Sequence, residues 1–242
     1  MVSMSPTVKL LILADIHSNL EAFQAIRNQI SFEYGTVDYT VGVGDLVGYA
    51  ASPNEVCELA KEVLDVCVMG NHDAACTTGH SEGFRKAAAK AVEWTHEKLT
   101  TENKTYLSLL KEELRFNVNR MEFYITHGSP KDHLAEYVLP STPEKKKEDY
   151  LKQVQPCDMM ILGHSHIGML FRGDNGIIFN PGSVGQPRDG DPRASAAILE
   201  IHEDGSFENI WFRVDYDITS AARHMREAGL PHYLYERLFF GE

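Results

Sequence analysis

The sequence predicts an α/β fold in which short buried strands alternate with helices. Near the start, three apolar runs without polar alternation are each followed by a polar loop and then a segment of helical character. Continuous apolar runs of this kind are typical of strands buried on both faces of an open sheet. Each of the three loops also brings in an Asp, His or Asn, and ligands of such sheets bind outside the carboxyl ends of the strands. The 242 residues show no internal repeat or linker, which favours one continuous domain over residues 1–242.

The first half of the chain supplies the three strand and helix units in order. The first predicted helix begins at Asn19, and Pro53 stands where the first turn of the second would lie, a position that proline favours. The predicted strands are Val8 to Ala14, Tyr39 to Val43 and Val66 to Met69, and the predicted helices are Asn19 to Ile30 and Pro53 to Val66.

The rest of the chain predicts a helical insertion and a second group of strands. Ser81 to Leu110 is rich in helix-forming residues and is expected to lie over the site as a cap. A charged helix follows over Pro143 to Val154, with Ser141 or Thr142 as its N-cap. A last helix begins at Asp217. The remaining predicted strands are Leu114 to Val118, Met121 to Thr126, Asp158 to Leu162, Met169 to Arg172, Ile177 to Asn180, Ala194 to Ile201 and Phe207 to Val214.

Composition excludes several classes of protein. The net charge is −12 with histidine neutral, and this field repels nucleic acid and anionic lipid, so neither is expected as a partner. The early apolar run Leu10 to Ala14 is too short for a signal-peptide core or a membrane span, which predicts a soluble, cytoplasmic protein. The four cysteines form no C-x-x-C pair and are expected to be buried hydrophobic residues. Phosphate binding in so acidic a chain requires local positive charge, and bound metal is its usual source.

Potential metal ligands follow directly after five of the predicted strands. They are carboxylate, imidazole and amide groups without thiolate, a set that suits Mn²⁺, Fe or Zn²⁺ better than a structural zinc. Each motif alone has an ordinary explanation, such as a turn or a strand-end histidine. Together they are too many for one ion and about right for two ions that share a carboxylate. The seven candidates are Asp15, His17, Asp45, Asn71, His127, His164 and His166.

In this order the motifs resemble those of the calcineurin-like metallophosphoesterase superfamily. The motifs are Asp15-x-His17, Gly44-Asp45, Gly70-Asn71-His72-Asp73, His127-Gly128 and Gly163-His164-Ser165-His166. The loop from Asn180 to Arg188 is similar to that of the small bacterial and archaeal phosphodiesterase-like members. The resemblance spans Leu10 to about Leu199. It implies a four-layer α/β/β/α sandwich of two mixed β-sheets flanked by helices, with a dimetal site at their upper edge.

The resemblance also implies how the two ions are held. Asp45 would bridge them, and His72 would stay free of metal as a general acid or a stabiliser of the transition state. One ion would be held by Asp15, His17, Asp45 and His166, and the other by Asp45, Asn71, His127 and His164.

Three further residues are candidates for a catalytic or substrate-binding role, and each also has a structural explanation. Asp73 would orient the imidazole of His72 or point away from it. Arg188 would bind the phosphate, since a guanidinium can contact two of its oxygens, or would pair with Asp189 or Asp191 on the surface. Asn19 would face the substrate or only cap its helix.

These expectations together predict a dimetal phosphoesterase. It would hydrolyse a small phosphodiester or phosphomonoester by in-line attack of a metal-bridging hydroxide, with no covalent intermediate. Mn²⁺ is the expected ion, with Fe, Zn²⁺ and Ni²⁺ as alternatives. The segment Gly44 to Ala50 lacks the later Asp and Arg of Ser/Thr phosphoprotein phosphatases, which disfavours phosphoprotein or dinucleoside polyphosphate hydrolysis but leaves both open. A non-catalytic scaffold is a further alternative, although every ligand position is filled.

Overall fold

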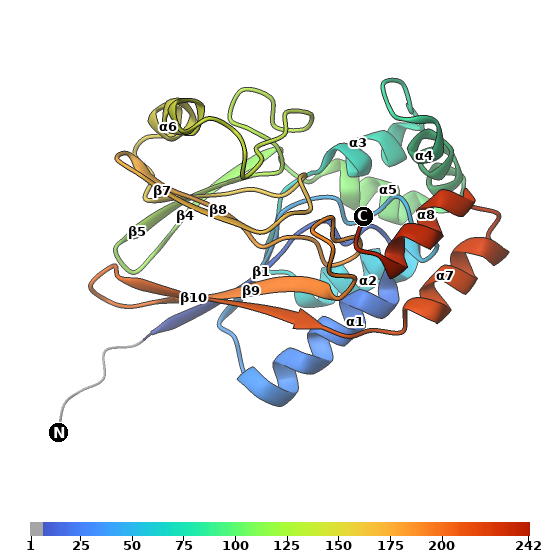
Figure 1. The fold of residues 1–242 in the computed structure, drawn as a ribbon, viewed down its shortest axis with the longest axis horizontal. Coiled ribbons are helices and arrows are strands. Elements are labelled where there is room, and N and C mark those ends of the chain that lie inside the picture. Colours follow the sequence, from blue (N-terminus) through green and yellow to red (C-terminus); the bar gives the residue numbers. More distant parts are fainter. Residues whose placement is uncertain (1–6) are drawn as a thin grey trace.

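Two five-stranded mixed sheets lie face to face in the computed structural model, which describes residues 7–242 (Figure 1). The first sheet has the order β10 (Phe207–Val214), β9 (Ala194–Ile201), β1 (Val8–Leu13), β2 (Tyr39–Gly42) and β3 (Val66–Cys67). The second has the order β4 (Glu113–Val118), β5 (Met121–Thr126), β6 (Met159–Ile161), β8 (Gly176–Asn180) and β7 (Met169–Gly173).

Both sheets contain three parallel strands with antiparallel neighbours. In the first sheet β1, β2 and β3 are parallel, and β9 and β10 continue the sheet from β1 in antiparallel fashion. In the second, β5, β6 and β8 are parallel, and β4 and β7 are the antiparallel edges. The loops that follow the parallel strands of both sheets therefore meet at one end of the molecule, where ligands of such sheets bind.

The buried strands have apolar side chains on both faces because each sheet is covered twice. In β1, Leu10 and Ile12 pack between the two sheets, whereas Leu11 and Leu13 pack with the helices outside. Successive side chains of a strand point to opposite faces, so a strand that is covered on both faces is apolar at every position. The predicted strand from Val8 to Ala14 is confirmed.

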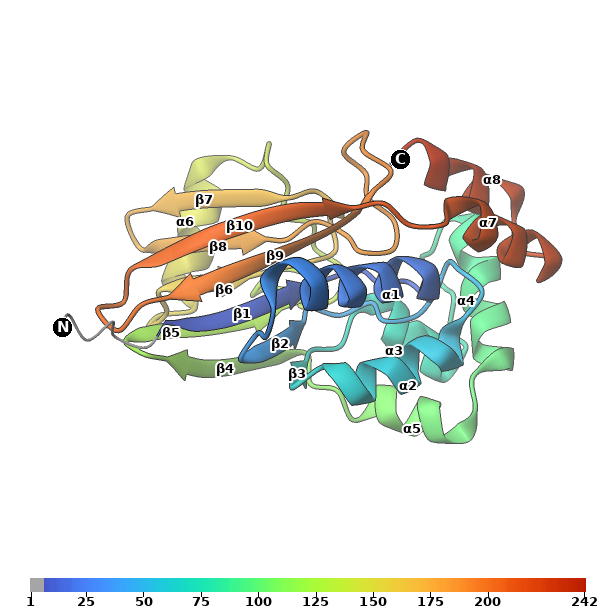
Figure 2. The same ribbon diagram turned by 90° about the horizontal axis from the view of Figure 1, so that it is seen from below.

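Helices form the two outer layers (Figure 2). The helices α1 (Leu20–Gln29) and α2 (Pro53–Val63) contribute to the core on the outer side of the first sheet, and a π-helical turn over Ile30–Tyr34 extends α1. Helix α6 (Glu144–Gln153) packs on the outer side of the second sheet, with Tyr150 and Leu151 against Met160 and Ile178. The predicted four-layer α/β/β/α sandwich is confirmed.

The remaining helices gather at the end of the molecule where the ligand loops meet. They are α3 (Asn71–Thr78), α4 (Lys86–Lys98), α5 (Thr101–Ser108), α7 (Ile218–Glu227), α8 (His232–Glu236) and a 3₁₀ turn over Arg237–Phe239. Helices α4 and α5 of the predicted cap segment pack beside α2 and α3, and the loop before α4 borders the cleft described below.

Three local predictions are wrong, each for a physical reason. Asn71 is not in a loop, because Gly70 and Asp73 form the start of α3 there. The second helix ends at Val63 rather than Val66, since Val66 already pairs with Val41 in the sheet. Neither Ser141 nor Thr142 caps α6: its N-cap is Pro143, and the hydroxyl of Thr142 accepts a hydrogen bond from the backbone of Leu139 instead.

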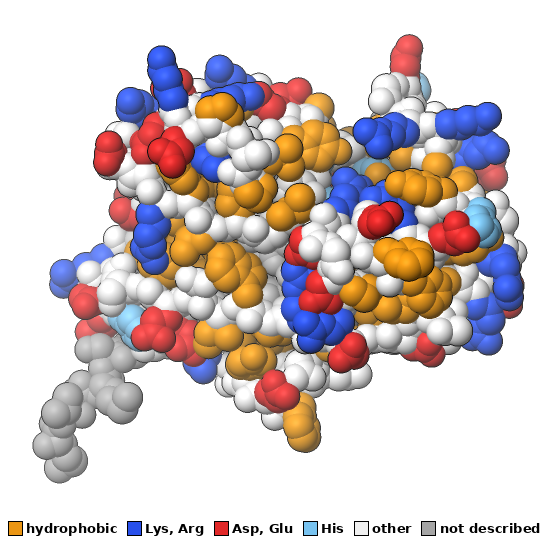
Figure 3. All heavy atoms as spheres, in the orientation of Figure 1, with side chains coloured by type: hydrophobic (Ala, Val, Ile, Leu, Met, Phe, Trp, Pro, Cys, Tyr) orange, Lys and Arg blue, Asp and Glu red, His pale blue; other side chains and the backbone are white. Residues whose placement is uncertain are grey.

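No helix in the described part of the chain is long and apolar enough to cross a membrane. The charge of the molecule is unevenly spread, however. Although the net charge is −12, Lys and Arg side chains gather in the hollow between α8 and the helices beside it (Figure 3).

Candidate metal centre

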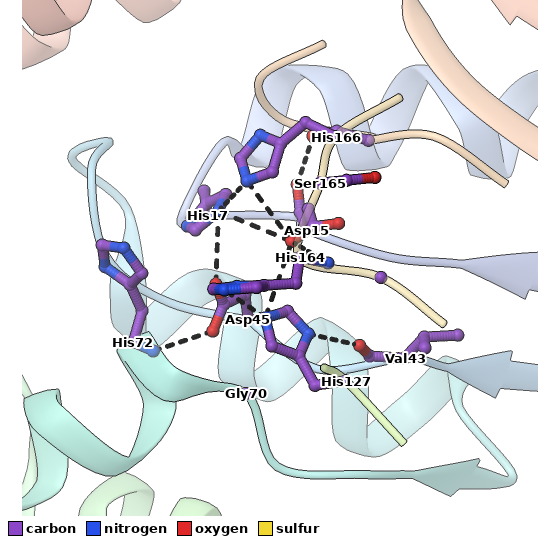
Figure 4. Close-up of polar contacts among 12 residues, drawn as sticks. Asp15, His17, Val43, Asp45, Gly70, His72, His127, His164, Ser165 and His166 are labelled. Atoms are coloured by element: carbon purple, nitrogen blue, oxygen red, sulfur yellow. Dashed lines mark hydrogen bonds and ion pairs between the residues drawn. The ribbon is translucent and has the colours of Figure 1, made fainter. Parts of the chain in front are cut away.

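The structure brings six of the seven predicted ligands together (Figure 4), and Asn71 lines the adjoining cleft beside His164. The six are buried, and each residue is at most 5% exposed. The first sheet contributes Asp15 and His17 after β1, Asp45 after β2 and Asn71 at the start of α3; the second contributes His127 after β5, and His164 and His166 after β6.

The ligand loops have an unusual backbone. Five of the seven candidates lie in the left-handed region, with φ between 53° and 64°. This conformation costs a non-glycine residue of order 1–3 kcal/mol, and such residues cluster at functional sites. The surrounding fold therefore holds these residues in a backbone conformation that is unfavourable for them locally. The five are Asp15, His17, Asp45, His164 and His166.

The donor atoms form groups of three, within each of which all atoms lie within 4.8 Å of one another. One group is Asp15, His17 and His166, and another is Asp45, His127 and His164. Asp45 stands between the two groups: its Oδ2 lies 3.5 Å from Nε2 of His17 and 3.2 Å from Nε2 of His127. This is the position required of a bridging carboxylate.

Backbone carbonyl groups set the orientation of the imidazoles. Nδ1–H of three histidines donates to a carbonyl oxygen: His17 to Val47 at 3.2 Å, His127 to Val43 at 2.8 Å and His166 to Gln186 at 2.6 Å. Each Nδ1 therefore carries a proton and each Nε2 faces the centre, as in metal sites; in the neutral imidazoles of His17 and His166, Nε2 presents a lone pair. His164 is reversed, because its Nε2 donates to the oxygen of Ala135 at 3.2 Å and leaves Nδ1 free.

Several buried acceptor atoms have no donor among the described residues. Oδ2 of Asp15 and Oδ1 of Asn71 are buried without a hydrogen bond. The Nε2 atoms of His17 and His166, both oriented as acceptors, face each other at 3.1 Å. Buried polar atoms are rarely left unsatisfied, and facing lone pairs repel. A cation near these atoms would satisfy them, so the residues fit a pair of divalent ions.

The protonation states of the ligands fit this interpretation. Burial lowers the pKa of His17 and His166 well below the ordinary range and that of His164 to about 3, which keeps these imidazoles neutral and able to bind metal. Burial raises the pKa of Asp15 to about 7. Burial also favours the neutral acid of Asp45, but the neighbouring His127 outweighs it and holds the pKa of Asp45 well below its usual value. Burial lowers the pKa of His127, but Asp45 outweighs it and raises this pKa to about 10, so His127 carries a proton on Nε2 that a metal ion would displace.

His72 lies at the border between the metal ligands and the cleft. Its ring contacts the rings of Tyr49 at 4.4 Å and of His17 and Phe84 at 4.8 Å, and its Nδ1 is buried without a partner. Gly48, at φ +92°, leaves room for this ring, since a Cβ there would lie 2.5 Å from Nδ1. One donor atom of His72 also groups with His17 and Asp45, so the imidazole is within reach of the bridging position.

Asp73 and Asn19 hold the loops together. The carboxylate of Asp73 accepts hydrogen bonds from the backbone of Val47 at 3.1 Å and of Gly70 at 3.0 Å, and it makes none with the imidazole of His72. The fully buried Asn19 caps α1 through Ala22 N, and its amide donates to the backbone oxygen of Gly185. Both side chains are thus occupied by backbone groups.

Arg188 lines the cleft beside His72 and does not pair with its acidic neighbours. Asp189 pairs with Arg213 and Asp191 with Arg193, whereas Arg188 donates to Tyr49 Oη at 3.3 Å and to Gln186 Oε1 at 3.1 Å. The alternative of a surface ion pair is therefore wrong. Sequence reasoning missed Tyr49, which contacts His17, His72 and Arg188, because a tyrosine in a loop carries no signal of its own.

A family model, the calcineurin-like phosphoesterase superfamily domain, matches residues 8–204. The chain belongs to this superfamily. It is 35% identical to an uncharacterised protein, MJ0912, of Methanocaldococcus jannaschii, over 95% of this chain and 97% of the relative.

Solved structures agree with this assignment. A metallophosphoesterase from Sphaerobacter thermophilus is 32% identical, with a TM-score of 0.80 over 98% of this chain and 100% of that chain. The hypothetical protein PH1004 from Pyrococcus horikoshii has a TM-score of 0.87 over 97% of this chain and 99% of that chain, and its 21% identity shows the fold alone.

Replacing Gly70 by Ala should weaken metal binding by this member of the superfamily without removing any candidate ligand. A Cβ at Gly70 would lie 2.1 Å from Oδ1 of Asp45, although the backbone there, at φ −99°, accepts alanine. We expect at least a tenfold loss of affinity for Mn²⁺, measured by calorimetry, because ligand positioning alone is worth 10–100-fold. Gly168→Ala is the control, since its Cβ would meet nothing closer than 3.7 Å. Equal affinity in the two variants would contradict the close approach.

The metal-free protein should lose stability between about pH 6.5 and pH 4 in part through His72. Burial lowers the pKa of His72 to about 4. Between about pH 6.5 and pH 4, His72 is therefore protonated in the unfolded chain but stays neutral in the folded chain. Stability from this group is complete above about pH 6.5 and falls as the pH drops. The free energy of unfolding is measured with urea in the presence of EDTA at both ends of this pH range. Its decrease on acidification should be larger in the wild type than in His72→Gln, by a difference on the order of 1–3 kcal/mol. Identical pH dependence of the two proteins would refute the assigned shift.

Proposed function

We propose that this phosphoesterase hydrolyses a small phosphodiester or phosphomonoester by direct attack of water on phosphorus, with no covalent enzyme intermediate. The observation that supports this most is the pair of buried donor groups that meet at Asp45 beside a cleft containing His72 and Arg188. Imidazoles, carboxylates and an amide oxygen meet there, and several of their buried atoms lack partners.

The two groups would hold one ion each. Asp15, His17 and His166 form the first group, and His127, His164 and the amide oxygen of Asn71 supply the second, with Asp45 shared. When bound, two such ions would acidify a water molecule and neutralise the phosphoryl oxygens. The ligand set suits Mn²⁺, with Fe, Zn²⁺ and Ni²⁺ as alternatives.

The protein's own side chains would supply the proton and the position of the substrate. The imidazole of His72 lines the cleft, where the negative charge of a bound phosphate would raise its pKa and allow it to protonate the leaving oxygen. Arg188 brings a positive charge to the same cleft and would hold an oxygen of the phosphate. The backbone bonds of Asp73 and Asn19 would keep the ligand loops in place.

Aryl phosphoesters test the proposal directly. Protein stripped of metal with a chelator and resupplied with Mn²⁺ should hydrolyse bis-p-nitrophenyl phosphate or p-nitrophenyl phosphate, and the faster of the two distinguishes a diesterase from a monoesterase. Activity should be absent before Mn²⁺ is added. Protein that binds no metal would contradict the proposal and favour a scaffold, and turnover that survives complete metal removal would contradict it as well.

A further inference from the structure

A cleft of about 690 Å³ leads away from the candidate metal centre. Asn71, His72 and His164 form its inner end, and the loop before α4 and the C-terminal helix α8 form its outer walls. This volume is that of a small-molecule site, and it is larger than a single phosphate group needs. The remaining space is available to the rest of the substrate.

The walls of the cleft combine aromatic and cationic side chains. Tyr49, Phe84 and Tyr137 supply aromatic surface, and the ring of Tyr137 stacks on His164 at 3.8 Å. The cations are Arg85, Arg188 and Arg237, whereas the one carboxylate in the lining belongs to the exposed Glu82. An excess of three arginines over one carboxylate is unexpected in a chain of net charge −12. Figure 3 shows the corresponding concentration of Lys and Arg side chains in this hollow.

Arg188 and Arg237 line the same cleft although they come from distant parts of the sequence. The backbone N–H of Arg188 donates to the oxygen of His166 at 3.1 Å, and its guanidinium lies 5.9 Å from the ring centre of Tyr49, so Arg188 is next to the candidate metal ligands. Burial and the positive charge of Arg188 lower the pKa of Arg237.

Among the described residues, the guanidinium of Arg188 has no carboxylate partner within ion-pair distance. Nε of Arg188 is buried without a hydrogen bond, and its terminal nitrogen donates only to neutral oxygens. Nε of Arg237 donates to the main-chain oxygen of Glu242, and the charge of Glu242 partly offsets that of Arg188, while the guanidinium lies over the ring of Tyr233 at 5.1 Å. An anion in the cleft would reduce the remaining repulsion between the two guanidinium groups.

We infer that Arg237 binds a second anionic group of the substrate, a carboxylate or a further phosphate, beyond the phosphoester that Arg188 and the metal centre hold. Arg237 is then a specificity-determining residue, and the substrate class is a small organic phosphoester with an additional negative charge. This inference rests on the proposed function, because it places the phosphoester at the metal ligands. The aromatic walls would contact the body that joins the two anionic groups.

Non-hydrolysable phosphonates in matched pairs test the inference by calorimetry on the Mn²⁺-loaded protein. The pairs are phenylphosphonate with 4-carboxyphenylphosphonate and propylphosphonate with 3-phosphonopropionate, which present the second charge at two distances. We expect the charged member of at least one pair to bind about tenfold or more tightly, the usual contribution of a charge-assisted contact with arginine. A 1,4-phenylenediphosphonate arm shows whether carboxylate or phosphonate is preferred.

Variants of Arg237 decide whether this residue causes the preference. Arg237→Gln should abolish it while the affinity for the neutral member stays within about twofold, and Arg237→Lys should retain part of it. Arg226→Gln, an exposed arginine of α7 outside the cleft lining, is the control and should bind like the wild type.

Two outcomes would overturn the inference. One is equal binding of the charged and neutral members of both pairs. The other is an Arg237→Gln variant that keeps the preference or loses affinity for both members alike, since the latter places Arg237 on the phosphoester itself. Hydrolysis of aryl phosphoesters is measured on the same samples. Active protein without the preference would refute the second site alone, and inactive protein with the preference would refute the proposed reaction alone.

Discussion

Asp45→Asn is expected to remove both metal ions and all metal-dependent phosphoester hydrolysis. The carboxylate of Asp45 lies between the two donor groups, with Oδ2 within 3.5 Å of both His17 and His127. Its replacement by a neutral amide removes a shared ligand and half of the aspartate charge at the centre. Because loss of an outer partner alone costs 10–100-fold in metal affinity, we expect at least about 10²-fold here at each position.

The control for this experiment is a second aspartate at the opposite end of the same strand. Asp38 precedes β2, is exposed, and accepts a hydrogen bond from the backbone of Lys9. Asp38→Asn should keep two Mn²⁺ per chain by plasma mass spectrometry after gel filtration. Circular dichroism of both variants establishes that each is folded. Two tightly bound ions in Asp45→Asn would refute the bridging role.

His72→Ala is expected to keep both metal ions and to lower turnover by roughly 10²–10⁴-fold, the usual contribution of a general acid. The ring of His72 lies at the inner end of the cleft, and its backbone N–H donates to Oδ1 of Asp45 at 2.8 Å. The substitution leaves this backbone bond in place, so the position of Asp45 should not change. His72→Gln fills more of the space and should show the same loss.

The dependence on the leaving group separates acid catalysis from a structural effect. A p-nitrophenolate leaves without protonation, whereas a phenolate needs it far more, so the loss should be larger for phenyl phosphate than for p-nitrophenyl phosphate. The exposed His80, on the loop after α3, supplies the control variant His80→Ala, which should have wild-type rates. If His72→Ala lost a metal ion, the imidazole would be a ligand, in line with its grouping with His17 and Asp45.

The fold was largely predictable because the pattern of apolar residues along the sequence depends on which faces of a strand are buried. A strand covered by a helix layer on one face and a second sheet on the other has no polar face, so its residues are continuously apolar, as from Leu10 to Ala14. The hairpin of β4 and β5 was predicted for a similar reason, since two adjacent apolar segments leave room only for a tight turn at Asn119 and Arg120. The start of α3 was missed because its cap is made by Gly70 and Asp73 within the ligand motif itself.

The candidate ligands were predictable as a set because each stands where a strand ends, and strand ends of one sheet edge meet in space. Roles that depend on a neighbour were not. Asp73 follows His72 in the sequence but bonds to the backbone of Val47 and Gly70, and Asn19 follows His17 but caps α1. Adjacent residues point in different directions, so sequence proximity alone does not identify the partner of a side chain.

The sequence by itself determined the α/β class, the superfamily and the seven candidate donor side chains, because these follow from strand burial and from motif order along the chain. The tertiary structure alone decided which donor atoms face one another, that Arg188 is free of Asp189 and Asp191, and that Arg237 of the C-terminal turn lines the same cleft. The physical reason is that ligand geometry and charge pairing depend on distances between segments far apart in the chain. Those distances are set by the packing of the two sheets and of α8, and they cannot be predicted from a local pattern in the sequence.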